Sequence, residues 1–192
     1  MAAVCVYCSS SGRIDPSYVE LAAAVGTELA RRGHSLVSGG GSVSCMGAVA
    51  RAARAGGAHT VGVIPRVLLD LEVADHDADE LLVTDDMRAR KGLMDARSDA
   101  FLTLPGGLGT LEEFFEVLSW RTLGLHTKPI VIVDLGGYWQ PLAALLRSCV
   151  EGGFAERSHL DVVAFIETLD QLLPTLAAMP RAAMAENELD RL

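Results

Sequence analysis

The sequence predicts an α/β fold, a doubly wound parallel sheet of the Rossmann-like type, built as a single domain. Short apolar runs of four to six residues alternate along the chain with longer segments in which apolar residues recur at helical spacing. The short runs look buried on both faces, which is typical of strands covered by helices on both sides of a sheet. Glycine-rich turns follow several of these runs, as they do at the ligand-binding edge of such sheets.

The first half of the chain alternates strand and helix signals. After a β-branched first strand, Asp15 serves as a helix N-cap with Pro16 at the first helical position, and Gly33 ends that helix. A later strand is stopped by Pro65. The expected elements are strands at 4–8, 35–38, 60–64 and 81–84, a helix from 16, a glycine-rich turn at 39–47 entering a helix to about 55, an irregular acidic and mobile loop at 66–79, and a helix at 86–97.

The second half repeats the alternation. A strand at 100–104 ends at Pro105, and Thr110 opens a helix to about residue 123, with Glu113 at the spacing of a capping box. The remaining expected elements are strands at 129–134 and 162–166 and helices at 139–150 and 169–179. No repeat or linker divides the chain, so we expect residues 1–180 to form the single domain and 181–192 to be a frayed tail.

The composition limits the classes of function. Of 192 residues, 50% are hydrophobic, and the net charge of −9 argues against broad binding to nucleic acid or to anionic membranes. No apolar run approaches the roughly 18 residues of a membrane span, and the chain begins without the basic region of a signal peptide. The four cysteines are irregularly spaced, and a chain of this size needs no disulfide frame. We therefore expect a cytoplasmic protein with reduced thiols.

The stretch from Ala100 to Glu116 predicts a site for an anion. A strand, a glycine turn and a helix N-terminus follow one another, and the free N–H groups and the helix dipole at such a turn favour negative charge. The carboxylates of Glu112, Glu113 and Glu116 stand beside that site, which suggests chemistry next to a bound phosphate. The structural alternative is that Glu113 only caps the helix and Glu112 only complements the dipole.

The other constellations give weaker signals. Gly39-x-Gly41 resembles a dinucleotide turn, but its third glycine position is Ser44, and neither the Walker pattern nor a paired histidine motif for metal occurs. Cys5-x-x-Cys8 lies within a strand, which favours ordinary burial. Four basic residues precede the central strand and form either a solvated helix face or a fork for a phosphate or ribose hydroxyl. They are Arg88, Arg90, Lys91 and Arg97.

Three stretches together resemble the LONELY GUY family, whose members were long labelled possible lysine decarboxylases. The run from Pro105 to Glu113 matches the family pattern P-G-G-x-G-T-x-x-E at every fixed position. Met87-x-x-Arg90-Lys91 and the turn from Gly39 to Ser42 support the match. Further similarity runs through most of the chain to about residue 180.

The resemblance implies a phosphoribohydrolase that cuts the N-glycosidic bond of cytokinin riboside 5′-monophosphates, and in many members of AMP, to give an adenine-type base and ribose 5-phosphate. It implies that Arg90 and Glu113 are the catalytic pair, that the protein is a homodimer with the site near the interface, and that no metal, nicotinamide or pyridoxal cofactor is needed. The implied substrate-binding residues are Ser9, Gly40, Gly41, Ser42, Met46, Met87, Lys91, Gly106, Gly107, Gly109, Thr110 and Glu112.

The chain departs from the family pattern at several positions. Ser44 and Cys45 precede Met46-Gly47 where members commonly carry Gly-Leu, and Arg88 replaces a histidine. We expect Ser44 to narrow the nucleotide crevice and Arg88 to add positive charge, with effects on base preference and rate. A rival interpretation is a non-catalytic carrier of a nucleotide or a molybdenum-cofactor-like ligand, because related chains resemble such carriers.

Overall fold

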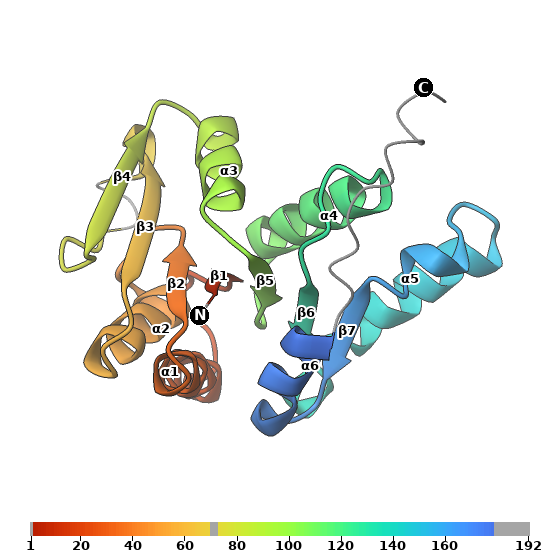
Figure 1. The fold of residues 1–192 in the computed structure, drawn as a ribbon, viewed down its shortest axis with the longest axis horizontal. Helices are drawn as coiled ribbons and strands as arrows, with labels where there is room; N and C mark the ends of the chain where they lie inside the picture. Colours follow the sequence, from red (N-terminus) through yellow and green to blue (C-terminus); the bar gives the residue numbers. More distant parts are fainter. Residues whose placement is uncertain (1, 70–72, 179–192) are drawn as a thin grey trace.

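The computed structural model describes residues 2–69 and 73–178 and confirms the doubly wound parallel sheet (Figure 1). Seven strands lie in the order β4-β3-β2-β1-β5-β6-β7, and all neighbouring strands run parallel. The strands are β1 (Ala3–Tyr7), β2 (Ser35–Ser38), β3 (Thr60–Pro65), β4 (Glu80–Thr84), β5 (Ala100–Thr103), β6 (Ile130–Val133) and β7 (Val163–Ile166).

Helices cover both faces of the sheet, as the apolar strands predict. The helices are α1 (Pro16–Arg31), α2 (Ser44–Ala55), α3 (Met87–Ala96), α4 (Leu108–Thr122), α5 (Gln140–Glu151) and α6 (Leu172–Ala178). Helices α1, α2 and α6 pack on one face with Val4 and Val6, and α3, α4 and α5 pack on the other with Cys5 and Tyr7 (Figure 1). Alternate residues of the central strand therefore enter two separate cores. None of the described helices is both long and apolar enough to cross a membrane.

The direction of winding reverses at β1. The chain passes from β1 through β2 and β3 to β4 on one side, then returns to place β5 on the other side of β1, with Tyr7 opposite Thr103 (Figure 1). The loops that follow β1 and β5 therefore diverge to opposite faces of the sheet. In doubly wound sheets, ligands bind in the crevice that such a reversal opens at the carboxyl ends of the strands.

Two boundaries differ in kind from the sequence expectation. Pro65 is the last residue of β3 and pairs with Thr84. The end of a strand tolerates a residue without an N–H group. The last helical segment is a 3-10 turn (Leu169–Gln171) followed by α6. The expected frayed tail, residues 181–192, lies outside the described residues, as do residues 70–72 of the expected mobile loop.

The predicted capping box was wrong. Helix α4 begins at Leu108, and Gly107 is its N-cap, with no side chain capping the first turn. Thr110 therefore lies inside the helix, where its side chain packs on the backbone of Gly106: a Cβ on that glycine would lie 2.1 Å from Thr110 Oγ1. Because Glu113 is one turn further into the helix, its carboxylate does not cap α4.

Candidate active site

A cavity of about 270 Å³ lies at the reversal between β1 and β5. One wall is the loop after β1, and the other is the first turn of α4, while α2 and α3 contribute one side chain each. The lining residues are Cys8, Ser9, Ser10, Ser11, Met46, Arg90, Gly107, Leu108, Gly109, Thr110 and Glu113. The glycine turn of the central stretch and the serine loop therefore meet at one crevice, as their places after neighbouring strands predict.

The α4 side of the cavity is suited to a phosphate. The first-turn N–H groups of α4 have no side-chain acceptor, because the cap is Gly107. The helix dipole adds positive potential at the same point. The carbonyl of Gly106 accepts a hydrogen bond of 2.7 Å from Tyr138 Oη, which fixes the turn that precedes the helix. This end of the cavity therefore offers main-chain donors held in place for an anion.

Arg90 and Glu113 meet beside these donors. The Nη1 atom of Arg90 lies 4.0 Å from Oε1 of Glu113, and the two side chains are only 5% and 11% exposed. Two carbonyls orient the guanidinium: Nε donates to Val63 at 3.1 Å, and Nη2 donates to Gly39 at 3.2 Å. In this arrangement the carboxylate can accept a proton, and the largely buried guanidinium can stabilise negative charge next to it.

Gly39 has a role that the sequence expectation missed. A Cβ at this position would lie 1.9 Å from Arg90 Nη2, so any side chain would displace the guanidinium. The strand β2 ends one residue earlier, and its carboxyl end thus supplies both the space and the carbonyl that hold Arg90. The signal in the sequence was the triple glycine itself, which we compared with a dinucleotide turn.

Lys91, the next residue after Arg90, is engaged elsewhere. Its ammonium group forms ion pairs with the carboxylates of Glu112 and Glu116 on α4, and its side chain is 12% exposed. Burial acts to lower the pKa of Lys91, but the hydrogen bonds that its ammonium group donates to both carboxylates outweigh that effect, so the pKa of Lys91 lies above its ordinary value. These contacts join α3 to α4 next to the Arg90–Glu113 pair. The single positive charge of Lys91 therefore offsets part of the negative charge of these two carboxylates beside the anion site.

The loop after β1 contributes hydroxyl and thiol groups. Ser9 Oγ accepts a hydrogen bond of 3.1 Å from the Ser11 N–H, so its hydroxyl proton remains to be donated to a ligand. Burial raises the pKa of the Cys8 thiol well above its ordinary value, and the nearby Cys45 and Glu113 add to that shift. Cys8 is therefore a protonated thiol at neutral pH, which makes it a poor nucleophile.

Comparison with known proteins identifies the family of this chain. The family model described as "Possible lysine decarboxylase" matches residues 46–176. A cytokinin riboside 5′-monophosphate phosphoribohydrolase of Mycobacterium marinum is 47% identical over 174 residues, which cover 91% of this chain and 92% of that protein. A protein of the same name from Mycobacterium tuberculosis is 48% identical over 174 residues, with the same coverage. The chain belongs to the LONELY GUY family.

A solved structure from outside these LONELY GUY relatives shares the fold. The molybdenum cofactor binding protein of the phototrophic bacterium Rippkaea orientalis superposes with a TM-score of 0.68 at 20% identity, covering 92% of this chain and 94% of that one. At this identity the likeness shows the fold alone. The relatives at 47% and 48% identity bear the name of a hydrolase, which favours the enzyme over the carrier that the sequence left as a rival.

The structure separates the residues implied by the LONELY GUY resemblance into two groups. Those that line the cavity are Ser9, Met46, Arg90, Gly107, Gly109, Thr110 and Glu113. Those outside its lining are Gly40, Gly41, Ser42, Met87, Lys91, Gly106 and Glu112. Several of the second group support the first: the Gly41 N–H donates to Met46 Sδ at 3.0 Å, and Met87 Sδ lies 3.8 Å from Arg90 Nη1. Their part in substrate binding stays a prediction.

Other lining residues were not on the predicted list. Ser10 and Ser11 stand in the loop after β1, whose position at a strand end was a usable signal. Leu108 is 86% exposed and occupies the variable position of P-G-G-x-G, where the pattern gives no information. Ser44 does not line the cavity, and the expectation that it narrows the nucleotide crevice stays a prediction.

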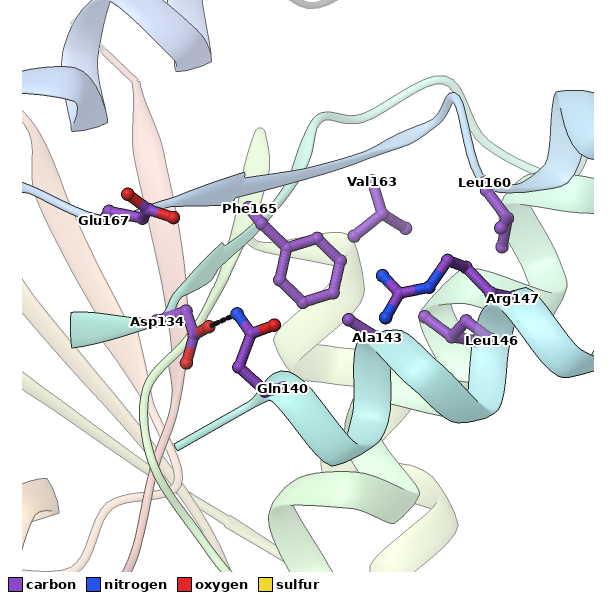
Figure 2. Close-up of a pocket in the computed structure, with 9 residues that line it drawn as sticks. All are labelled: Asp134, Gln140, Ala143, Leu146, Arg147, Leu160, Val163, Phe165 and Glu167. Atoms are coloured by element: carbon purple, nitrogen blue, oxygen red, sulfur yellow. Dashed lines mark hydrogen bonds between the residues drawn. The ribbon is translucent and has the colours of Figure 1, made fainter. Parts of the chain in front are cut away.

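A second cavity of about 270 Å³ lies between α5 and β7 and lacks these features (Figure 2). Its buried carboxylate, Asp134, accepts hydrogen bonds of 2.6 Å from the Trp139 N–H and from Gln140 Nε2. Figure 2 shows Phe165 of β7 over α5, which contributes both apolar and polar side chains to the walls. No glycine turn belongs to its described lining, and neither do Arg90 and Glu113. The crevice at β1 and β5 is therefore the candidate active site.

Proposed function

We propose that this chain hydrolyses the N-glycosidic bond of cytokinin riboside 5′-monophosphates and of AMP, releasing the adenine-type base and ribose 5-phosphate. The observation that carries the proposal is the 4.0 Å approach of Arg90 to Glu113 beside an uncapped helix N-terminus. The names of the relatives at 47% and 48% identity support the same reaction.

In the proposed mechanism, the first-turn amides of α4 hold the 5′-phosphate near Gly107 to Thr110. Glu113 lies about one helical turn further along the same helix, roughly 5 Å, so the anchored phosphate places the ribose beside its carboxylate. Cleavage passes through an oxocarbenium-like state, which Glu113 stabilises while it takes a proton from the attacking water. The base departs with the electron pair of the broken C1′–N bond and takes up one proton, so that the free base and ribose 5-phosphate are formed. Arg90 orients Glu113 and the sugar hydroxyls through its fixed guanidinium.

The lysines of the chain argue against the decarboxylase named in the family description. A Schiff-base cofactor needs a lysine that can lose its proton, and the sequence contains only Lys91 and Lys128. Lys91 pairs with two glutamates, and Lys128 Nζ lies 2.7 Å from the Asp95 carboxylate. Neither lysine lines the candidate cavity. Hydrolysis by a carboxylate fits the residues present, and it requires no pyridoxal group.

We also propose that the protein acts as a homodimer in the cytoplasm. An apolar hollow of about 430 Å³ borders the candidate site, and exposed Leu108, Tyr138 and Leu145 lie in or beside it. Its lining consists of Gly106, Leu111, Phe115, Tyr138, Trp139, Pro141, Leu142 and Leu145. Leu145→Glu should shift the protein from dimer to monomer in light scattering. An unchanged mass would place the interface elsewhere.

Incubation with isopentenyladenosine 5′-monophosphate and with AMP, followed by chromatography of the bases, tests the reaction. We expect both bases to be released in amounts equal to the ribose 5-phosphate formed. The nucleoside isopentenyladenosine is the matched control, because it lacks the phosphate that anchors the sugar and should react far more slowly. Release of no base from either nucleotide would refute the proposed function.

A further inference from the structure

Ser44 adopts a backbone conformation that serine rarely takes. It is the first residue of α2, and its φ angle is +52°, in the left-handed region that favours glycine. Among the described residues other than glycine, only Val73 shares a positive φ. Strained backbone of this kind persists where other contacts hold it, and it is concentrated near functional sites.

A short hydrogen bond accompanies the strain. Ser44 Oγ donates to the Ser11 carbonyl at 2.6 Å, and this contact joins α2 to the loop after β1 across 33 positions of the sequence. Ser11 lines the candidate cavity, whereas Ser44 does not. Ser44 therefore contacts a residue of the cavity wall without lining the cavity itself.

The bond determines which groups the wall offers to a ligand. A carbonyl oxygen turned toward a phosphate would repel it, and the Ser44 hydroxyl keeps the Ser11 carbonyl directed at α2. The Ser11 N–H meanwhile donates to Ser9 Oγ, which leaves the Ser9 hydroxyl proton for an acceptor in the cavity. With both contacts in place, the loop faces the uncapped end of α4 with a donor.

We propose that Ser44 is a positioning residue, whose hydroxyl holds the loop from Ser9 to Ser11 in the conformation that receives a 5′-phosphate. The proposal rests on the proposed function and names a determinant of phosphate binding outside the cavity lining. It accounts for a serine at a position where glycine would remove the backbone strain.

Two substitutions separate the hydroxyl from the strain. Ser44→Ala removes the hydrogen bond and keeps the strained φ, so the melting temperature should fall. Ser44→Gly removes both, so the melting temperature should stay level or rise. For both variants we expect the affinity for ribose 5-phosphate, measured by calorimetry, to fall about fivefold and KM to rise in proportion, with kcat within about twofold of wild type.

Ser148→Ala is the matched control, because Ser148 Oγ donates to a backbone carbonyl, that of Leu145, at 2.8 Å on an exposed part of α5. It should leave ribose 5-phosphate binding unchanged. Wild-type affinity in either Ser44 variant would overturn the proposal. An affinity that falls in Ser44→Ala but not in Ser44→Gly, in parallel with the melting temperatures, would also overturn it, because the loss would then reflect stability alone. A wild-type chain that releases no base would refute the proposed function instead, so the two failures are distinguishable.

Discussion

Two charged contacts join α3 to α4 through consecutive residues, and they differ in character. Lys91 reaches the surface carboxylates of Glu112 and Glu116 and hydrogen-bonds directly to both. Arg90 lies deeper, donates hydrogen bonds to two main-chain carbonyls, and stands 4.0 Å from the Glu113 carboxylate. The Lys91 contacts, the outer contact, are short and lie toward the surface. The approach of Arg90 to Glu113, the inner contact, is longer, and both residues line the cavity.

The difference shows how one short motif can supply both a structural and a chemical function. The Lys91 contacts tie the two helices together and so help to fix the positions of Arg90 and Glu113. Because Arg90 is oriented by the backbone, its charge can act on Glu113 and on a ligand at once. The comparison predicts a large effect on chemistry for the inner contact and a small one for the outer contact.

The largest effect is expected from Glu113→Gln, which keeps the shape of the side chain and removes its ability to take a proton. We expect kcat for isopentenyladenosine 5′-monophosphate to fall about 10³-fold, in the range typical of a general base. The neighbouring Glu112→Gln is the control and should stay within about threefold of wild type, because Glu112 is 54% exposed and Lys91 keeps Glu116. An equal fall in kcat in both variants would contradict the assignment of chemistry to the inner contact and structure to the outer one.

Gly39→Ala should disturb the inner contact without changing any charge. The new methyl would overlap Arg90 Nη2 and push the guanidinium away from Glu113, and misplacement of about 1 Å costs on the order of 10²-fold in rate. We therefore expect kcat/KM to fall about 10²-fold. Gly92→Ala on α3 is the control, since a Cβ there meets nothing within 4 Å. A Gly39 variant as active as wild type would show that the position of Arg90 is not critical.

Lys91→Met should weaken the outer contact while retaining the length of the side chain. We expect stability to fall by about 1 kcal/mol, measured by urea unfolding, and kcat/KM to fall about tenfold or less because α3 and α4 are less firmly held. Lys91→Arg should retain most of the wild-type stability and most of the wild-type kcat/KM. If Lys91→Met abolished turnover while the fold stayed intact, Lys91 would have to act on the substrate.

The smallest effect concerns the pH dependence of that outer contact. The pKa of Lys91 is raised in the folded chain, so its ion pairs contribute full stability below the unfolded pKa, about 10.4, and lose that contribution as the pH rises through the folded value. The stability difference between wild type and Lys91→Met should thus be constant from about pH 7 to 9 and shrink above about pH 10.5. A difference that vanishes near pH 8 would contradict the assigned direction.

Much of the fold could be predicted because its signals are local. Apolar runs, the cap at Asp15 with Pro16, and the glycine after α1 each depend on a few consecutive residues. The start of α4 could not be placed in this way. Gly107 caps that helix with its backbone alone, and the later Thr110 and Glu113 imitate a capping box.

The site was predictable as a set of residue types but not as a set of contacts. Arg90 and Glu113 came from the family resemblance, and the winding of the sheet explains why they meet. The contacts of Arg90 with Gly39 and of Lys91 with Glu112 span 51 and 21 positions of sequence. No local pattern encodes such pairings, so Gly39 was missed as a support for Arg90, and Lys91 was expected to bind substrate.

A crystal structure of the Glu113→Gln variant with isopentenyladenosine 5′-monophosphate would test the central claim most directly. We expect the phosphate on the amides at the start of α4, next to Gly107, and the ribose between residue 113 and the Arg90 guanidinium. A nucleotide bound in the cavity between α5 and β7, or one whose ribose lies away from both side chains, would contradict the account.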